Sequence, residues 1–410
     1  TDAYGDVEDW MFKRPDGNES GDHSTVRRRV KPLAGGVSVL FLSVVLFGFF
    51  HGSHSKDGAL EKSDKHAFRI VTVAKGLDHP WGLAFLPNGD MLVTERSGQL
   101  RIIREGKLDP KPVRGLPDNI AASGQGGLLD VVLHPDFGKN RLIYLSYAGR
   151  GKGGAGTEVA RGRFTGDRLE NLEVIFRVSP KTGGTGHYGS RLVFATDGTL
   201  FITTGDRRQM KEAQNPGNHL GTVIRLRDDG SVPPDNPFIG RSDIRPEIYS
   251  YGHRNGQGMA LRPGGSIIWM HEHGAQGGDE VNILRPGANY GWPAITYGVD
   301  YGGGKISDKT SAPGMEQPVV YWDPSIAPSG MAFYDGDRFP EWRGNLFVGA
   351  LKLAHLRRLE LKGDKVVAQE KLLEDLDARI RDVRNGPDGY LYVLTDSSDG
   401  RLIRLEPEGP

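Results

Sequence analysis

From about residue 68 onward, apolar segments of strand length alternate with polar turns in a pattern that recurs six times. In each unit an apolar segment leads to a turn rich in Asn, Asp, Gly or Pro, and a second apolar segment follows. The six units are residues 81–96, 128–148, 190–206, 258–274, 330–351 and 383–405. Turn cores such as PNGD, TDG and PDG tolerate positive φ and reverse the chain between two strands. The pattern therefore predicts antiparallel β-hairpins rather than long helices.

Six similar units in one chain are typical of an all-β radial repeat, most simply a six-bladed β-propeller over residues 68–410. The longer stretches 207–247 and 275–329 are expected to contain inserted loops on one face, usually the binding face. A β-sandwich with coincidental turns would explain one or two of these matches but not six.

An uncharged apolar stretch, residues 33–50, stands apart from the repeats and follows a basic N-terminal segment, residues 1–32. The basic residues just before it are Arg27, Arg28, Arg29 and Lys31. Its length suits either a short transmembrane anchor or the apolar core of a signal sequence. An anchor is favoured because no small-x-small cleavage site follows. Residues 51–67 are expected to form a polar linker, and the positive-inside rule predicts an exported propeller on the periplasmic or extracellular face.

The charge balance narrows the range of partners. The chain has 52 Lys and Arg against 52 Asp and Glu, so its formal net charge is zero. It lacks the basic surplus that is typical of nucleic-acid-binding proteins. It also has no cysteine, which excludes disulfides and thiolate metal sites. Any metal ion must therefore be bound by oxygen or imidazole ligands.

Four cationic residues each adjoin a repeat unit: Arg254, Lys352, Arg379 and Arg381. If the repeats surround one axis, these side chains converge on one pocket, which in a neutral protein indicates a small anionic ligand. Arg379 and Arg381 would share one face of a strand, where paired guanidiniums suit a carboxylate or a phosphate. The alternative is that these arginines are solvated or pair with Asp377 or Asp382.

His187 is the candidate base. It lies in GTGHYGSRLVF, at the entry to a predicted strand, between glycines that let a ligand approach closely. A neutral imidazole there can accept a hydroxyl proton. Asp206 ends the same hairpin, where its carboxylate either orients the imidazole or caps the strand end. Gln125, in SGQGGLLD, also stands at a strand entry and either binds a ligand or caps a loop.

The segment HEHGAQGGDEVN, residues 271–282, is a candidate metal site. It is not the helical HExxH motif of zinc enzymes, because a strand would place His271 and His273 on one side and Glu272 on the other. A glycine-rich backbone with exposed carbonyls, together with the carboxylate of Asp279, better suits a hard cation such as calcium. The alternative is a polar loop that binds no metal.

Together these stretches resemble the soluble sugar dehydrogenases that depend on pyrroloquinoline quinone (PQQ), specifically the aldose sugar dehydrogenase branch. The matching stretches include GQGGLLDVVLHPDF, GSRLVFATDGTLFITTGDR, YGHRNGQGMA, HEHGAQGGDEVN and ARIRDVRNGPDGYLYVLTD. The similarity covers about residues 70–406. It implies a six-bladed propeller that carries PQQ and Ca2+ on its top face and oxidises aldoses at C1 to lactones.

The resemblance also implies a role for each matching residue. His187 would be the general base for the anomeric hydroxyl, Asp206 would orient it, and hydride would move from C1 to C5 of PQQ. Arg254 and Asn255 would polarise the quinone carbonyl that receives the hydride. The residues expected to hold the cofactor are Gln125, Arg254, Asn255, Lys352, Arg379 and Arg381.

The calcium site and the substrate range depart from the family pattern. The backbone carbonyls of Gly274 and Ala275 match the calcium ligands, with Asp279 nearby, but the family commonly has Pro at the position of Ala275. Gly186 stands where the glucose-oxidising branch has an acidic neighbour of the base, which favours a broader range of aldoses. The long inserts of that branch are missing, which favours a monomer. An external electron acceptor is expected because PQQ must be reoxidised.

Two other functions stay open at the level of sequence. A calcium-dependent lactonase-type hydrolase would need a cage of calcium-binding side chains near the axis and would have no use for convergent cations. A non-catalytic propeller that binds carbohydrate or protein would be expected to lack the base or the cofactor cations. Because this chain has both, the sequence favours a dehydrogenase.

Overall fold

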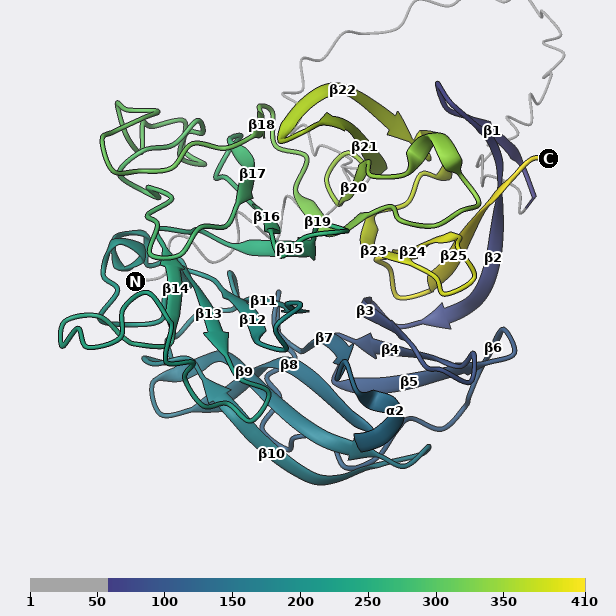
Figure 1. Ribbon diagram of the computed structural model, residues 1–410, viewed down its shortest axis with the longest axis horizontal. Coiled ribbons are helices and arrows are strands. Elements are labelled where there is room, and N and C mark those ends of the chain that lie inside the picture. Colours follow the sequence, from purple (N-terminus) through teal and green to yellow (C-terminus); the bar gives the residue numbers. More distant parts are fainter. Residues whose placement is uncertain (1–57, 410) are drawn as a thin grey trace, which may run out of the picture. The chain divides into compact units, whose positions relative to one another are not determined.

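The computed structural model describes residues 58–409, which form six antiparallel β-sheets arranged as the blades of a ring (Figure 1). The prediction of an all-β, six-bladed propeller is confirmed. The expected basic segment 1–32 and apolar segment 33–50 lie outside the described residues. Across residues 58–409, no helix is both long and apolar enough to cross a membrane.

Each of the first five blades has four strands that follow one another in the sequence. Blades one and two contain β3 (Pro80–Phe85), β4 (Met91–Glu95), β5 (Gln99–Arg104), β6 (Lys107–Leu108), β7 (Leu128–Leu133), β8 (Leu142–Gly151), β9 (Gly154–Phe164) and β10 (Leu169–Arg177). Blades three and four contain β11 (Gly189–Phe194), β12 (Leu200–Thr204), β13 (Thr222–Leu226), β14 (Ile248–Tyr251), β15 (Gly256–Leu261), β16 (Ile268–Glu272), β17 (Asp279–Ile283) and β18 (Val320–Trp322). Blade five contains β19 (Pro328–Phe333), β20 (Leu346–Ala350), β21 (His355–Lys362) and β22 (Lys365–Leu372). The helical segments are short: α2 (Phe137–Asn140), η1 (Met210–Gln214), η2 (Pro340–Trp342) and η3 (Glu374–Leu376).

The sixth blade closes the ring because it joins strands from both ends of the described chain. β23 (Ile380–Asn385), β24 (Leu391–Thr395) and β25 (Gly400–Pro407) pair in order, and β2 (Ala67–Leu77) then pairs antiparallel with β25. A short fifth strand, β1 (Leu60–Lys62), pairs with β2. Part of the stretch expected as a linker therefore belongs to the sheet. The strand β1 has only three residues, too few to show an apolar pattern in the sequence.

The first strand of every blade lines the ring, so β3, β7, β11, β15, β19 and β23 contact one another in turn and β23 contacts β3. Apolar side chains from neighbouring blades pack between the sheets, for example Trp269 against Phe333 with 5.5 Å between ring centres. The stretches 207–247 and 275–329, expected to contain inserted loops, hold β13, β17 and β18 as well as loops. These strands are only three to five residues long, which hid them in the sequence.

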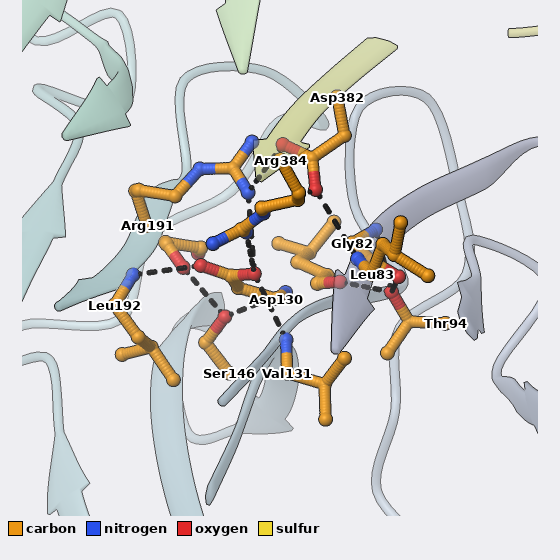
Figure 2. A network of polar contacts seen from close by, with 12 residues as sticks. Gly82, Leu83, Thr94, Asp130, Val131, Ser146, Arg191, Leu192, Asp382 and Arg384 are labelled. Atoms are coloured by element: carbon orange, nitrogen blue, oxygen red, sulfur yellow. Dashed lines mark hydrogen bonds and ion pairs between the residues drawn. The ribbon is translucent and has the colours of Figure 1, made fainter. Parts of the chain in front are cut away.

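A buried ion network connects the inner strands (Figure 2). Arg191 on β11 lies 3.2 Å from Asp130 on β7 and 3.1 Å from Asp382 on β23. Arg384 lies 2.8 Å from each of the same two carboxylates. Glycine on the neighbouring strand β19 leaves room for this network, since a Cβ on Gly330 would lie 2.1 Å from Asp382 Oδ1. The network therefore ties blades two, three and six together at the centre of the ring.

Candidate active site

The candidate residues gather at one edge of the blades because of how antiparallel hairpins are built. The start of a blade's first strand and the end of its second strand lie at the same edge. Four candidate residues come just before the first strand of a blade: Gln125, His187, Arg254 and Asn255. Four come just after a second strand: Asp206, Gly274, Ala275 and Lys352. The last two, Arg379 and Arg381, stand at the start of β23. Closure of the ring therefore brings widely spaced parts of the sequence to one face.

His187 is held by three neighbouring segments. Its Nδ1 is 2.6 Å from Asp206 Oδ1, and its backbone N–H donates to Gln125 Oε1 at 2.8 Å. The residue is buried and has a φ of +54°, which is unusual for a residue with a side chain. Gly205 makes this arrangement possible, because a Cβ there would lie 2.0 Å from the His187 carbonyl oxygen. Backbone strain of this kind is concentrated at functional sites.

Asp206 is fully buried, and both of its oxygens accept hydrogen bonds. Oδ1 accepts the backbone N–H of Arg208 at 2.8 Å in addition to facing His187, and Oδ2 accepts Trp292 Nε1–H at 2.8 Å. Burial opposes the charge of this carboxyl. The contacts with His187, Arg254 and Trp292 outweigh burial and hold the pKa of Asp206 below its ordinary value. An ionised Asp206 favours the His187 tautomer that carries its proton on Nδ1.

Arg254 lies directly beside this pair. Its carbonyl accepts the backbone N–H of Asp206 at 2.8 Å, and its guanidinium carbon is 5.3 Å from the centre of the Trp292 ring. Its Nη2 donates to the Tyr301 hydroxyl at 3.1 Å, and its Nη1 donates to the His273 carbonyl at 3.3 Å. These contacts fix a buried cation next to the candidate base.

The three side chains of the HEH segment position the backbone and Arg254. His271 and His273 both direct Nε2 toward backbone carbonyls at the start of β19, on one side of the strand as its alternation predicts. Glu272 lies on the other side, where it contacts His253 Nδ1 at 2.9 Å and accepts the backbone N–H of Arg254 at 2.5 Å. The two histidines thus join blades four and five, and Glu272 anchors Arg254.

Arg379 and Arg381 share one carboxylate, that of Asp396. Their Nη2 atoms are 3.2 Å and 2.6 Å from Asp396 Oδ2. The other oxygen of Asp396 is 2.9 Å from His79 Nδ1 and 3.9 Å from Arg96 Nη2. Burial opposes the charge of Asp396, but the cations around it hold its pKa well below the ordinary range. The guanidiniums of Arg379, Arg381 and Arg96 therefore all contact the carboxylate of Asp396, directly after β24.

Of the remaining predicted cofactor residues, two support the base segment and one stands apart. Gln125 accepts from His187, and Asn255 Oδ1 accepts the backbone N–H of Gly189, two residues beyond the histidine, at 3.0 Å. Lys352 is exposed after β20, and among residues 58–409 its ammonium forms no hydrogen bond or ion pair. The structure therefore brings all the predicted cations to the same edge but does not join Lys352 to the others.

A buried carboxylate fixes the segment expected to bind a cation. Asp279 accepts the backbone N–H of Gly274 at 2.9 Å, and those of Ile326 and Ala327 at 2.7 Å and 3.1 Å. Burial raises the pKa of Asp279 to about 6, although these hydrogen bonds lower it. Over residues 58–409, no group of three or more His, Asp or Glu side chains is arranged to hold a metal. A cation here would thus depend on backbone carbonyls such as those of Gly274 and Ala275.

Similarity to known proteins agrees with this geometry. A family model described as Glucose / Sorbosone dehydrogenase matches residues 77–404. This chain belongs to the glucose/sorbosone dehydrogenase family. It is 50% identical over 337 residues to the aldose sugar dehydrogenase YliI of Escherichia coli (strain K12), across 81% of this chain and 91% of that protein. The resemblance to the aldose sugar dehydrogenases is thus confirmed, and this chain is an oxidoreductase, a sugar dehydrogenase.

Two solved structures share the fold of this dehydrogenase. One, a glucose dehydrogenase, is 51% identical with a TM-score of 0.81, over 83% of this chain and 99% of that one. The other is the PQQ-bound form of an aldose sugar dehydrogenase from Streptomyces coelicolor. It is 29% identical with a TM-score of 0.70, over 83% of this chain and 98% of that one.

Among the side chains of the site that sequence reasoning missed are Asp396, with its neighbours His79 and Arg96, and Trp292. Asp396 directly follows the second strand of blade six, and Asp206 stands one residue further on after that of blade three, so a carboxylate close to the end of this strand was the available signal. Trp292, in NYGWP, gave no such signal. Its contact with Asp206 depends on the path of the long segment between β17 and β18.

Proposed function

We propose that this dehydrogenase oxidises aldose sugars at C1 to lactones, with PQQ as the hydride acceptor, Ca2+ beside the cofactor and an external acceptor for the electrons. The observation that carries the proposal is the buried His187–Asp206 pair, 2.6 Å apart, with Arg254 next to it and further cations across the same face. A lactonase or a binding propeller has no need for this combination of a base and surplus cations.

His187 is the proposed general base. With Nδ1–H donated to Asp206, the Nε2 atom is the acceptor nitrogen of the ring. It takes the proton of the C1 hydroxyl as C1 becomes the lactone carbonyl. The ionised Asp206 stabilises the imidazolium that forms, as a buried carboxylate does in catalytic triads. This division of roles agrees with the low pKa of Asp206.

The cation cluster fits a cofactor with three carboxylates. Arg379, Arg381 and Arg96 face one carboxylate of the protein, and Arg381 Nε is buried with no hydrogen-bond partner among the described residues. We assign cofactor binding to Gln125, Arg254, Asn255, Lys352, Arg379 and Arg381. When bound, PQQ supplies a two-electron acceptor for the hydride of C1. Arg254 stands where negative charge would develop on the acceptor.

The chain also offers a set of oxygen donors for Ca2+. We assign the backbone carbonyls of Gly274 and Ala275 as its protein ligands, since hard cations accept such oxygen donors. Asp279 acts on the turn, because it accepts the N–H of Gly274 and so fixes the backbone that carries these carbonyls.

The test is dye-linked oxidation of aldoses by the full chain purified without cofactor, with PQQ and Ca2+ added singly and together. Activity that requires both additions supports the proposal. The variant His187→Gln should lose at least about 100-fold in kcat while PQQ binding, followed by absorbance titration, is retained. Failure of wild-type protein to bind PQQ and to oxidise any sugar would instead favour a binding propeller or a hydrolase.

A further inference from the structure

Two consecutive arginines follow Asp206 and turn back toward the base. Arg207 and Arg208 have φ values of +53° and +61°, so two residues with side chains adopt the left-handed conformation in succession. The backbone N–H of Arg208 donates to Asp206 Oδ1 at 2.8 Å, the same oxygen that faces His187. The carboxylate that orients the base therefore also anchors this arginine turn.

Arg208 lies against Gly186, the residue directly before the base. A Cβ on Gly186 would lie 2.7 Å from Arg208 Nε and 3.0 Å from its Nη2. The guanidinium thus occupies the space that a side chain at position 186 would need. Arg208 is half-buried, so part of this side chain next to the base segment is exposed to solvent.

Arg207 adds buried donors to the same loop. It is 4% exposed, its guanidinium carbon is 3.6 Å from the centre of the Tyr188 ring, and its Nη2 donates to the Gly184 carbonyl at 2.8 Å. Its Nε and Nη1 are buried and have no hydrogen-bond partner among the described residues. Buried guanidinium donors are nearly always satisfied in proteins, so a water molecule or a ligand would satisfy these two.

We infer that Arg208, supported by Arg207, is a specificity residue that selects aldoses carrying an anionic group, a carboxylate or a phosphate, away from C1. This inference rests on the proposed function. A guanidinium forms paired, charge-assisted hydrogen bonds with either anion, whereas a neutral aldose offers only hydroxyl groups. The anionic group is bound and not altered, while the proton of the C1 hydroxyl goes to His187.

The test compares kcat/KM for D-glucuronate, D-galacturonate and D-glucose 6-phosphate with kcat/KM for D-glucose and D-galactose, using the full chain loaded with PQQ and Ca2+. In wild-type protein the anionic sugars should be preferred. In Arg208→Gln their kcat/KM should fall at least about tenfold, through KM, while the value for D-glucose stays within about twofold. Arg208→Lys should restore part of the loss. The preference between uronates and the phosphate identifies the anion.

Arg241→Gln is the matched control, because Arg241 belongs to the same stretch but is exposed and pairs with Asp243 at 2.7 Å. It should leave every ratio unchanged. An equal loss for neutral and anionic sugars in Arg208→Gln would mean that Arg208 only holds the loop, and the inference would be wrong. A wild-type preference for neutral sugars would also overturn it.

Binding without turnover gives an independent readout. Calorimetry of D-glucuronate with His187→Gln should detect binding that the added change Arg208→Gln weakens about tenfold or more. Equal affinity in both variants would overturn the inference. If wild-type protein oxidises no sugar, neutral or anionic, the proposed function itself fails. That result is distinct from oxidation of D-glucose without any dependence on Arg208.

Discussion

Two clusters of arginines and carboxylates, one on the inner strands and one at the candidate active site, differ in how their charges are matched. In the central network, two guanidiniums meet two carboxylates, and Arg191 and Arg384 each contact both Asp130 and Asp382 (Figure 2). At the candidate active site, three guanidiniums face the single carboxylate of Asp396. In the first cluster each guanidinium contacts two carboxylates, whereas in the second three guanidiniums share the carboxylate of Asp396.

The pKa of a buried arginine is therefore shifted in opposite directions in the central network and at the candidate active site. Burial opposes the charge of Arg384, yet Asp382 and Asp130 outweigh burial and raise its pKa. Burial likewise opposes the charge of Arg381, but Asp396 alone does not compensate, and its pKa is lowered. The protein thus bears the cost of an incompletely compensated buried cation at the site. An anionic ligand would offset that cost, whereas the central network already offsets its own.

The largest expected effect is on catalysis. Asp206→Asn should lower kcat by about three to four powers of ten, because the amide favours the wrong tautomer of His187 and cannot stabilise the imidazolium. Steady-state kinetics with saturating PQQ and sugar measures this, and far-ultraviolet circular dichroism checks that the variant is folded. A loss below about tenfold would show that Asp206 serves the fold, as Asp130 does, and would remove the contrast between the clusters.

The next effect is on stability. Asp130→Ala leaves Arg191 and Arg384 buried beside one carboxylate in place of two, so the free energy of unfolding should fall by about 3–5 kcal/mol. Urea unfolding measures this change. Arg163→Ala is the control, because Arg163 and Glu170 form an exposed pair at 3.4 Å, and its effect should be at most about 1 kcal/mol. Equal effects of the two variants would show that the central network is not a stabilising feature.

A smaller effect is expected for Arg379, where a substitution should weaken cofactor binding without lowering the stability of the fold. Arg379→Ala should weaken PQQ binding by about 10- to 100-fold, since one charge-assisted hydrogen bond is lost. The free energy of unfolding should stay the same or rise, because Asp396 keeps two other guanidiniums nearby. Absorbance titration and urea unfolding of the same preparation test both parts, and Ca2+ affinity should change less. Unchanged PQQ affinity would remove Arg379 from the cofactor site.

The hairpins and several contacts of the candidate site could be predicted from the sequence, whereas the contacts between blades could not, for physical reasons. The six hairpins were evident because each inner pair of strands is apolar and ends in a turn with special backbone requirements. The predicted contact of His187 with Asp206 followed from one hairpin. Arg379 and Arg381 were expected to lie together, and in the structure both contact Asp396, which the sequence did not indicate. Contacts between blades, such as Asp130 with Arg384, depend on ring closure over long sequence separations and had no local signal.

The last expected effect appears only in acid, and it concerns the titration of Asp396 in the site cluster. The unfolded carboxyl has a pKa of about 3.9, and in the folded protein the pKa of Asp396 is well below its ordinary range. Its contribution to stability is therefore complete above about pH 4 and is lost as the pH falls through the folded value, because the unfolded state then binds more protons. Asp396→Asn removes this contribution, so the difference in unfolding free energy between wild type and variant should be constant near neutral pH and should shrink below about pH 4. Urea unfolding at a series of pH values tests this, and a difference that stays constant down to about pH 2 would mean that the cations around Asp396 do not stabilise its charge.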